Sequence, residues 1–217
     1  MHEFQREFIE FALRTEVLRF GEFTLRSGRR SPYFFDSGRF NTGESLASLG
    51  RFYLNAVEKA GIRFDMLFGP AYKGIPLASS LAIAYANERG RSVPYSFNRK
   101  EEKDHGEGGL LLGAPLAGRV LVVDDVITAG GSVTRSVELI RRAGAEAAGV
   151  VIALDRQERG TSGKSAVQDV EQACGIPVIS IVTLAELVEF LEQRGGAEDR
   201  LGDIRRYRDE YGVAARR

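Results

Sequence analysis

The chain has 217 residues, with 30 basic and 30 acidic side chains and a formal net charge of zero. This length suits a single domain with a well-buried core, and the balanced charge argues against a protein that coats nucleic acid. The single cysteine, Cys174, excludes an internal disulfide framework, and without a signal segment or an apolar run near ~18 residues we expect a cytoplasmic protein with no membrane partner.

The first part of the chain is expected to form a helix, a hairpin and a second helix. Apolar side chains recur at helical spacing in both helical segments, and a turn rich in Ser, Gly and Pro separates two short aromatic runs. The predicted ranges are a helix over 3–20, strands over 20–25 and 33–36, and a helix over 46–60 that ends at Gly61. Residues 1–63 are therefore interpreted as a cap on the rest of the domain.

From residue 64 onward, strands alternate with helices. The predicted strands are 65–69, 93–98, 120–123, 149–154 and 177–181, and the predicted helices are 75–88, 133–143, 165–174, 183–193 and 200–211. Such alternation predicts an α/β fold with a central, mostly parallel sheet and right-handed crossovers over residues 64–217.

The most informative stretch follows the apolar strand that ends at Val123. Two carboxylates, Asp124 and Asp125, come first, and the loop to Ser132 contains Thr128 and two glycines before a helical pattern begins. A helix N-terminus offers backbone N–H groups to a phosphate, while adjacent acids suit sugar hydroxyls or a divalent cation. The whole run predicts a ribose-phosphate site, although the acid pair alone would equally suit a helix cap, and a similar pair occurs in response-regulator receiver domains.

A second loop, from Gly69 to Gly74, also lies between a predicted strand and a predicted helix. Its small residues and Lys73 could surround a second anion such as a diphosphate. Taken alone, the segment would be better interpreted as a turn with a solvated lysine. Beside the first loop, the diphosphate interpretation is favoured.

The segment from Asn98 to Gly109 is dense in charge and glycine and has no apolar anchor. A disordered connector would have this composition. Its four potential cations, Arg99, Lys100, Lys103 and His105, favour a mobile lid over 98–115 that closes on a polyanion and excludes water.

Phe34, Phe35 and Arg156 form a third candidate group. Neighbours on a strand point to opposite faces, so one Phe could pack inward while the other flanks a flat ligand. Arg156 follows a strand end, where its guanidinium could hold a carboxylate in bidentate fashion. The alternatives are two core aromatics and a surface ion pair.

Five motifs together resemble the bacterial-type orotate phosphoribosyltransferases, which are type I phosphoribosyltransferases. They are Thr-Leu-Arg-Ser-Gly-Arg-Arg-Ser-Pro-Tyr-Phe-Phe, Gly-Pro-Ala-Tyr-Lys-Gly, Phe-Asn-Arg-Lys-Glu-Glu-Lys-Asp-His-Gly-Glu-Gly, Val-Val-Asp-Asp-Val-Ile-Thr-Ala-Gly and Leu-Asp-Arg-Gln-Glu-Arg-Gly. The resemblance spans residues 4–213. It implies the type I phosphoribosyltransferase fold and Mg²⁺-dependent transfer of the phosphoribosyl group from 5-phosphoribosyl 1-diphosphate (PRPP) to orotate, in pyrimidine (UMP) biosynthesis. It also implies a homodimer whose lids reach into the partner's site.

The resemblance also implies residue roles. Lys103, His105, Asp124 and Asp125 would be catalytic, and Phe34, Phe35, Thr128 and Arg156 would bind orotate. PRPP would be bound by Arg26, Tyr72, Lys73, Arg99, Lys100, Lys103, His105, Asp124, Asp125, Val126, Ile127, Thr128, Ala129, Gly130, Gly131 and Ser132. Mg²⁺ would be held mainly by PRPP, with Asp124 and Asp125 able to assist and no direct protein ligation.

One position departs from the family pattern, because Arg26 stands where the family commonly has Lys. The positive charge is kept, but a planar fork replaces a compact ammonium group.

Two other functions fit parts of the sequence. A purine or uracil could be the acceptor base, but Arg156 argues otherwise because uracil has no carboxylate. A PRPP-sensing regulator of transcription would want an added DNA-binding segment or a basic face, and the balanced charge supplies neither.

The lid hypothesis makes a direct prediction for Lys103→Ala. If Lys103 stabilises the charge that develops on the leaving diphosphate, the substitution should lower kcat by orders of magnitude while the protein stays folded and dimeric. Steady-state kinetics with circular dichroism and gel filtration would check this. Near-normal turnover would refute the role.

Overall fold

A computed structural model describes residues 1–25, 27–103, 109–128, 130–196 and 198–213, with only the backbone described for residues 102 and 103. The chain begins with α1 (Glu3–Arg14), the hairpin β1 (Leu18–Thr24) and β2 (Arg30–Phe35), the short 3₁₀ helix η1 (Ser37–Arg39) and α2 (Gly43–Ala60). The predicted order of helix, hairpin and helix is confirmed.

The first helix is shorter than the sequence pattern predicted. α1 ends at Arg14 because the chain turns at Glu16, which has a positive φ of 55°, and Leu18 already pairs with Phe35 in the hairpin. The second helix begins where Thr42 accepts a hydrogen bond from the backbone N–H of Ser45 at 3.1 Å, and it ends at Gly61 with a φ of 66°.

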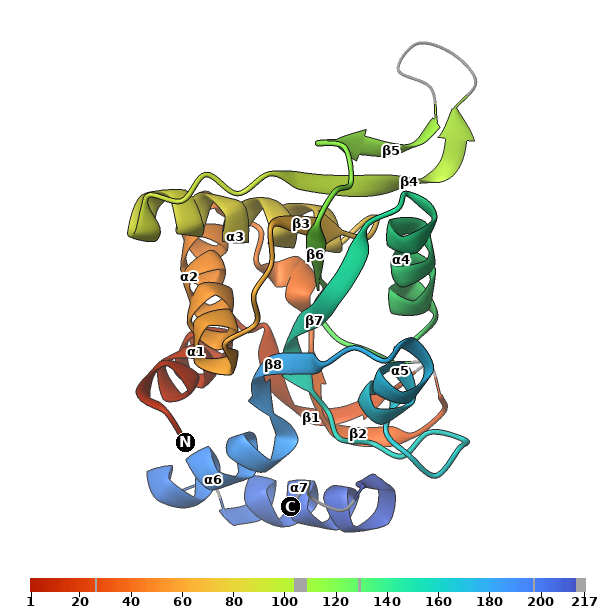
Figure 1. The fold of residues 1–217 in the computed structure, drawn as a ribbon. Helices are drawn as coiled ribbons and strands as arrows, with labels where there is room; N and C mark the ends of the chain where they lie inside the picture. Colours follow the sequence, from red (N-terminus) through yellow and green to blue (C-terminus); the bar gives the residue numbers. More distant parts are fainter. Residues whose placement is uncertain (26, 104–108, 129, 197, 214–217) are drawn as a thin grey trace.

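The main sheet has six strands in the order β5-β4-β3-β6-β7-β8, and only β5 is antiparallel to its neighbour (Figure 1). Its strands are β3 (Met66–Gly69), β4 (Tyr95–Lys103), β5 (Gly109–Gly113), β6 (Arg119–Val123), β7 (Glu146–Asp155) and β8 (Val178–Thr183). The helices after residue 64 are α3 (Gly74–Arg89), α4 (Gly131–Arg142), α5 (Ala166–Cys174), α6 (Leu184–Arg194) and α7 (Glu198–Tyr211). The predicted α/β architecture is confirmed.

The strands are buried on both faces, and alternate side chains enter two different cores. Leu121 and Val123 of β6 join the core formed with α1, α2, α3, α6, α7 and the hairpin, whereas Val120 and Val122 join the core formed with α4 and α5. Each fully buried side chain of this size contributes about 1.5–3 kcal/mol. The cap over residues 1–63 therefore packs into the same core as the sheet, and its separation as a subdomain stays a prediction.

The segment that the sequence analysis assigned to a loop over 98–115 is largely strand, so that assignment was wrong. β4 continues to Lys103, and β5 pairs with it from Gly109 to Gly113. The sequence pattern concealed this edge hairpin, because the apolar run of β5 is only three leucines long and lies between two glycines. The mobility of this segment stays a prediction.

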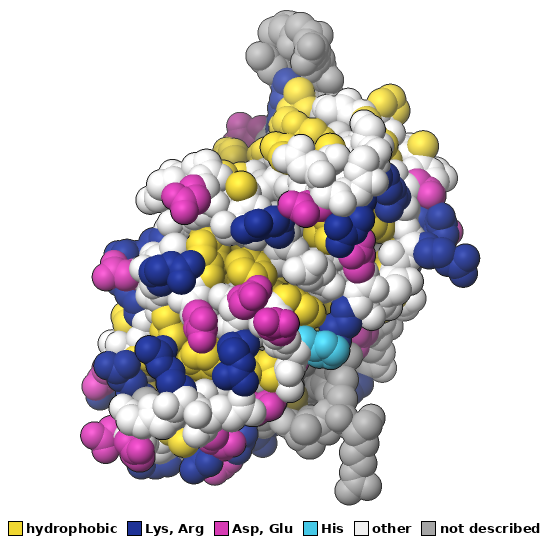
Figure 2. Space-filling view, turned by 90° about the vertical axis from the view of Figure 1, so that its left-hand side faces the viewer, with side chains coloured by type: hydrophobic (Ala, Val, Ile, Leu, Met, Phe, Trp, Pro, Cys, Tyr) yellow, Lys and Arg dark blue, Asp and Glu magenta, His cyan; other side chains and the backbone are white. Residues whose placement is uncertain are grey.

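The face over α1 and α2 carries both signs of charge around a strip of hydrophobic atoms (Figure 2). A groove on this face is lined by Glu7, Arg51, Phe52, Leu54, Asn55, Glu88 and Arg89, so acids and bases are balanced there. Among the residues that the structure describes, no helix is long and apolar enough to cross a membrane.

The turn between β3 and α3 admits only glycine at Gly74. A Cβ atom there would lie 2.4 Å from Pro70 Cδ and 2.9 Å from the carbonyl oxygen of Val123, and neither the proline ring nor the strand can easily move. We therefore expect Gly74→Ala to lower the free energy of unfolding by about 1–3 kcal/mol, measured by urea denaturation.

Gly43→Ala is the matched control, because a Cβ atom at the first position of α2 meets no described atom within 4 Å. It should be neutral or stabilise the protein by up to about 1 kcal/mol. Equal stability of the two variants would contradict the close approach at Gly74.

Candidate active site

Three loops follow parallel strands at the same edge of the sheet. They are residues 70–73 after β3, 124–130 after β6 and 156–165 after β7. The carboxyl ends of parallel strands are where ligands bind in open α/β sheets. Most of the residues that the sequence analysis selected lie in these loops or on neighbouring elements.

The two carboxylates after β6 lie on a continuation of the sheet. The backbone N–H of Asp124 donates to the Val151 carbonyl at 3.0 Å, and the Asp125 carbonyl accepts from the N–H of Ala153 at 2.8 Å. From α2, the Tyr53 hydroxyl donates to the Asp124 carbonyl at 2.8 Å. The acid pair is therefore fixed by both a neighbouring strand and a helix of the cap.

Asp125 connects two predicted anion sites. Its carboxylate accepts a hydrogen bond from Lys73 Nζ at 2.9 Å and another from the Ser37 hydroxyl at 2.5 Å. Its other oxygen accepts from the N–H of Val126 at 2.8 Å. The structure thus brings the predicted diphosphate loop to the predicted ribose acids. Sequence reasoning missed Ser37 and Tyr53, since neither belongs to a recognisable motif.

The surroundings of Asp124 change the pKa of its carboxyl group. Burial, and next the charge of Asp125, raise the pKa of Asp124 from 3.8 to about 7. Its carboxylate accepts one hydrogen bond from the backbone N–H of Asp125 at 3.0 Å. A ligand hydroxyl or a cation placed here would favour the ionised form, so this position is suited to a sugar diol.

The loop after the acids ends at the N-terminus of α4. Gly130 has a φ of 71°, and a Cβ atom there would lie 2.8 Å from Val170, so both backbone conformation and space favour glycine. Ile127 anchors the loop in the α4–α5 core, while Thr128 is exposed. The first-turn N–H groups of α4, from Gly131 onward, are free of helical bonds and are available to an anion.

The β4–β5 hairpin contacts the loop between β3 and α3. Lys100 Nζ of β4 lies 4.6 Å from the ring centroid of Tyr72, and the Asn98 side chain accepts a hydrogen bond from the N–H of Ala71 at 3.1 Å. The Ala71–Tyr72 peptide bond is cis. Arg99 lies on the same strand as Lys100.

Four predicted site residues cannot be placed in full. Arg26, His105 and Ala129 lie outside the described residues, and only the backbone of Lys103 is described.

The two phenylalanines of β2 lie on opposite faces, as predicted. Phe35 is buried in the core near Phe8 and Phe40, whereas Phe34 is half-buried and stacks on Phe23 with ring centroids 5.5 Å apart. Arg156 contacts the face of β2 that carries Phe35, not the one that carries Phe34. The grouping of Phe34 with Arg156 around orotate stays a prediction.

Arg156 forms the ion pair that the sequence analysis kept as an alternative, but it does so away from solvent. Its side chain is 10% exposed, and Nη2 lies 2.6 Å from Glu158 Oε1 and 3.0 Å from the Ser31 hydroxyl. The guanidinium carbon stacks 4.2 Å from the Tyr33 ring centroid. The contacts therefore fix the guanidinium at the end of β7.

Oxygen donors suited to a hard cation are present at the acid pair. Carboxylate oxygens are what Mg²⁺ prefers, although both oxygens of Asp125 are already hydrogen-bonded. Within the described part of the chain, no group of three or more His, Cys, Asp or Glu side chains could hold a metal. The donor set fits a cation that brings most of its own ligands.

Comparisons with known proteins agree on one family. A family described as the phosphoribosyl transferase domain matches residues 40–172. The chain is 60% identical over 213 residues to the orotate phosphoribosyltransferase of Thioalkalivibrio sulfidiphilus (strain HL-EbGR7), covering 98% of this chain and 100% of that one.

Solved structures give the same result. The orotate phosphoribosyltransferase of Francisella tularensis aligns with a TM-score of 0.86 and 40% identity, covering 95% of this chain and 100% of that one. The Mycobacterium tuberculosis H37Rv enzyme in complex with PRPP aligns with a TM-score of 0.64 and 27% identity, covering 85% of this chain and 98% of that one.

The raised pKa of Asp124 predicts how stability depends on pH. Because the folded-state pKa of about 7 exceeds the usual 3.8, the contribution of Asp124 to stability falls as pH rises from about 4 to about 7. Asp124→Asn should lack this fall, so the variant should gain roughly 1–3 kcal/mol relative to wild type between pH 5 and pH 8. Urea denaturation at both pH values measures the difference.

Asp65→Asn provides a control of opposite sign. Hydrogen bonds from Arg119 lower the pKa of Asp65 to about 2, so Asp65 is ionised and stabilises the fold at both pH 5 and pH 8. Asp65→Asn should therefore lower the free energy of unfolding by the same amount at both pH values. A constant difference between Asp124→Asn and wild type at pH 5 and pH 8 would contradict the raised pKa.

Proposed function

Since the chain belongs to the orotate phosphoribosyltransferase family, we propose that it transfers the 5-phosphoribosyl group of PRPP to orotate, as a pentosyltransferase of pyrimidine (UMP) biosynthesis. The products would be orotidine 5′-monophosphate and diphosphate. The observation that carries the proposal is the ion pair between Lys73 and Asp125, which joins a diphosphate loop to a ribose loop.

The arrangement of three anion-binding elements supports PRPP as the donor. The α4 N-terminus would hold the 5-phosphate, Asp124 and Asp125 would accept hydrogen bonds from the ribose hydroxyls, and Lys73 with Tyr72 would meet the diphosphate. Lys73 remains 59% exposed beside a nearly buried Asp125, so its ammonium group is accessible to a ligand. In the free protein the ammonium group of Lys73 pairs with Asp125. A bound diphosphate would take the place of Asp125 as the anionic partner of Lys73.

We propose Mg²⁺ as the cofactor. It would neutralise charge on the diphosphate as this group leaves. PRPP would supply most of its ligands, with Asp124 and Asp125 close enough to assist.

The chemistry asks the protein mainly to position the reactants. The bond from the anomeric carbon to the diphosphate oxygen breaks, and its electron pair leaves on diphosphate. A bond from that carbon to a ring nitrogen of orotate forms through an oxocarbenium-like state, and the proton of that nitrogen is released to solvent. Because neighbouring carbonyls already acidify this nitrogen, little base catalysis is needed. The protein's remaining tasks are to align the reactants, to exclude water and to stabilise the charge on the leaving diphosphate. We assign the stabilisation of this charge to Lys103 and His105 of the lid.

We propose a homodimer in which each lid reaches the partner's site. The β4–β5 hairpin extends beyond the body of the domain (Figure 1), which would let it reach a neighbouring subunit. Tyr72 and Ile83 are large hydrophobic side chains with 66% and 56% of their surface exposed, which supports a contact on this side. We also propose a cytoplasmic location, where the one buried thiol, Cys174, stays reduced.

A spectrophotometric assay tests the proposed function. Purified protein is mixed with orotate, PRPP and Mg²⁺, and orotate absorbance in the ultraviolet is followed, with uracil and adenine as control bases. We expect orotate to be consumed only when PRPP and Mg²⁺ are both present. Clear binding of PRPP by calorimetry without consumption of any base would instead favour a PRPP-sensing protein.

A further inference from the structure

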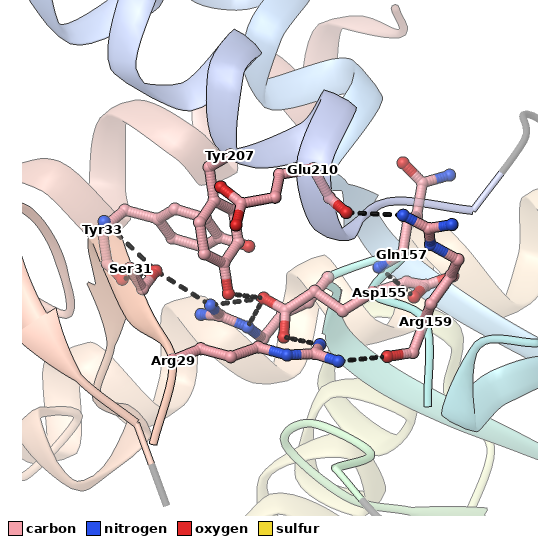
Figure 3. A network of polar contacts seen from close by, with 10 residues as sticks. Arg29, Ser31, Tyr33, Asp155, Gln157, Arg159, Tyr207 and Glu210 are labelled. Carbon is pink, nitrogen blue, oxygen red and sulfur yellow. Dashed lines mark hydrogen bonds and ion pairs between the residues drawn. The ribbon is translucent and has the colours of Figure 1, made fainter. Parts of the chain in front are cut away.

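The C-terminal helix α7 reaches the candidate base site mainly through contacts of Tyr207 with Glu158 and Arg156. Figure 3 shows Tyr207 of α7 beside Tyr33 of β2, and Glu210 of α7 beside Arg159 in the segment that follows β7. None of the motifs discussed above includes a residue of α7. The contacts nevertheless lead from this helix directly to Arg156.

Glu158 is the centre of these contacts. Its Oε1 accepts hydrogen bonds from Arg156 Nε at 2.7 Å and from the Tyr207 hydroxyl at 2.9 Å. Its Oε2 lies 3.8 Å from Arg29 Nη1. Glu158 is therefore held from two sides while it holds the guanidinium of Arg156.

The contacts of Arg156 leave one side of its fork available. Glu158 and Ser31 engage Nε and Nη2, and the Tyr33 ring covers one face of the plane. Nη1 takes part in none of these contacts. A guanidinium fixed on one edge and stacked on one face presents its remaining edge in a defined direction.

The segment that carries Arg156 is itself fastened to the C-terminal region. The N–H of Arg159 donates to the Tyr211 carbonyl at 2.7 Å, and the N–H of Val213 donates to the Gln157 carbonyl at 2.9 Å. Gln157 has a positive φ of 52°, a conformation that non-glycine residues adopt only where the surroundings impose it. Its side chain accepts from the N–H of Ala185 at 2.9 Å, which ties the segment to α6 as well.

We propose that Glu158 and Tyr207 are positioning residues for the acceptor base. They fix Arg156 so that its free edge meets the carboxylate of the substrate, and they make α7 a determinant of selectivity for a carboxylated pyrimidine. This inference rests on the proposed function. It extends the base site from Arg156 to a helix that contacts neither substrate.

Tyr207→Phe tests the inference with a minimal change. The ring can keep its edge contact with Tyr33, at 6.2 Å between centroids, while the contacts of the hydroxyl with Glu158 and Arg156 are lost. We expect KM for orotate to rise about three- to tenfold, with kcat and KM for PRPP changed less than about twofold. Glu158→Gln, which removes the charge that faces Arg156, should raise KM for orotate by about tenfold or more.

Tyr85→Phe is the matched control. Tyr85 is a buried tyrosine of α3 that packs on Phe64, away from the loops at the carboxyl edge of the sheet. Its variant should leave all three kinetic constants unchanged. A merely structural role of Tyr207 would lower thermal stability and affect both substrates alike, so melting temperatures are measured for every variant.

A double-mutant cycle identifies the route of the effect. If Tyr207 acts through Arg156, adding Tyr207→Phe to Arg156→Lys should change KM for orotate less than it does in the wild type. Full additivity, or an unchanged or lowered KM for orotate in both single variants, would overturn the inference. Failure of wild type to consume orotate would refute the proposed function instead, so the two failures are distinguishable.

Discussion

The burial of two adjacent carboxylates at the end of the central strand is the constraint on which the site depends. Burial, and next the charge of Asp125, raise the pKa of Asp124 to about 7. Neighbouring residues compensate through hydrogen bonds. Lys73 and Ser37 donate to the Asp125 carboxylate, and Tyr53 donates to the backbone carbonyl of Asp124. Burial and the neighbouring charge make ionisation of Asp124 unfavourable in the free protein. Hydroxyl donors or a cation bound at the acid pair would stabilise the ionised form and so contribute favourably to binding.

The same constraint explains why the neighbouring loops are so closely packed. Lys73 can reach Asp125 only because the turn after β3 folds tightly against β6, and this turn requires glycine at residues 69 and 74. A Cβ at either position would collide with backbone or with the ring of Pro70. The two glycines therefore affect electrostatics as well as packing, because the close approach that they allow brings the ammonium group of Lys73 to the carboxylate of Asp125.

Local patterns predicted most helices and strands and the loops that connect them, since each strand, turn and helix start carries its signal within about ten residues. The partners that complete the site could not be predicted in this way. Ser37 lies 88 positions from Asp125, and Tyr207 lies 49 positions from Glu158. Such contacts depend on how the cap and α7 pack on the sheet, and no periodicity encodes that. The edge strand β5 was missed for a related reason, because its own apolar run is only three leucines between two glycines and its pairing comes from β4.

Strand β2 connects the two halves of the site and fixes their separation. Ser31 near its start contacts Arg156, Ser37 just after its end contacts Asp125, and Tyr33 and Phe35 between them are buried in the main core. The proposed acceptor site and the proposed ribose site are thus connected by one segment whose inward side chains cannot shift without disturbing the packing. In the proposed transfer the base nitrogen and the anomeric carbon must meet at close range, so the hydrophobic packing of β2 would set the geometry of that reaction.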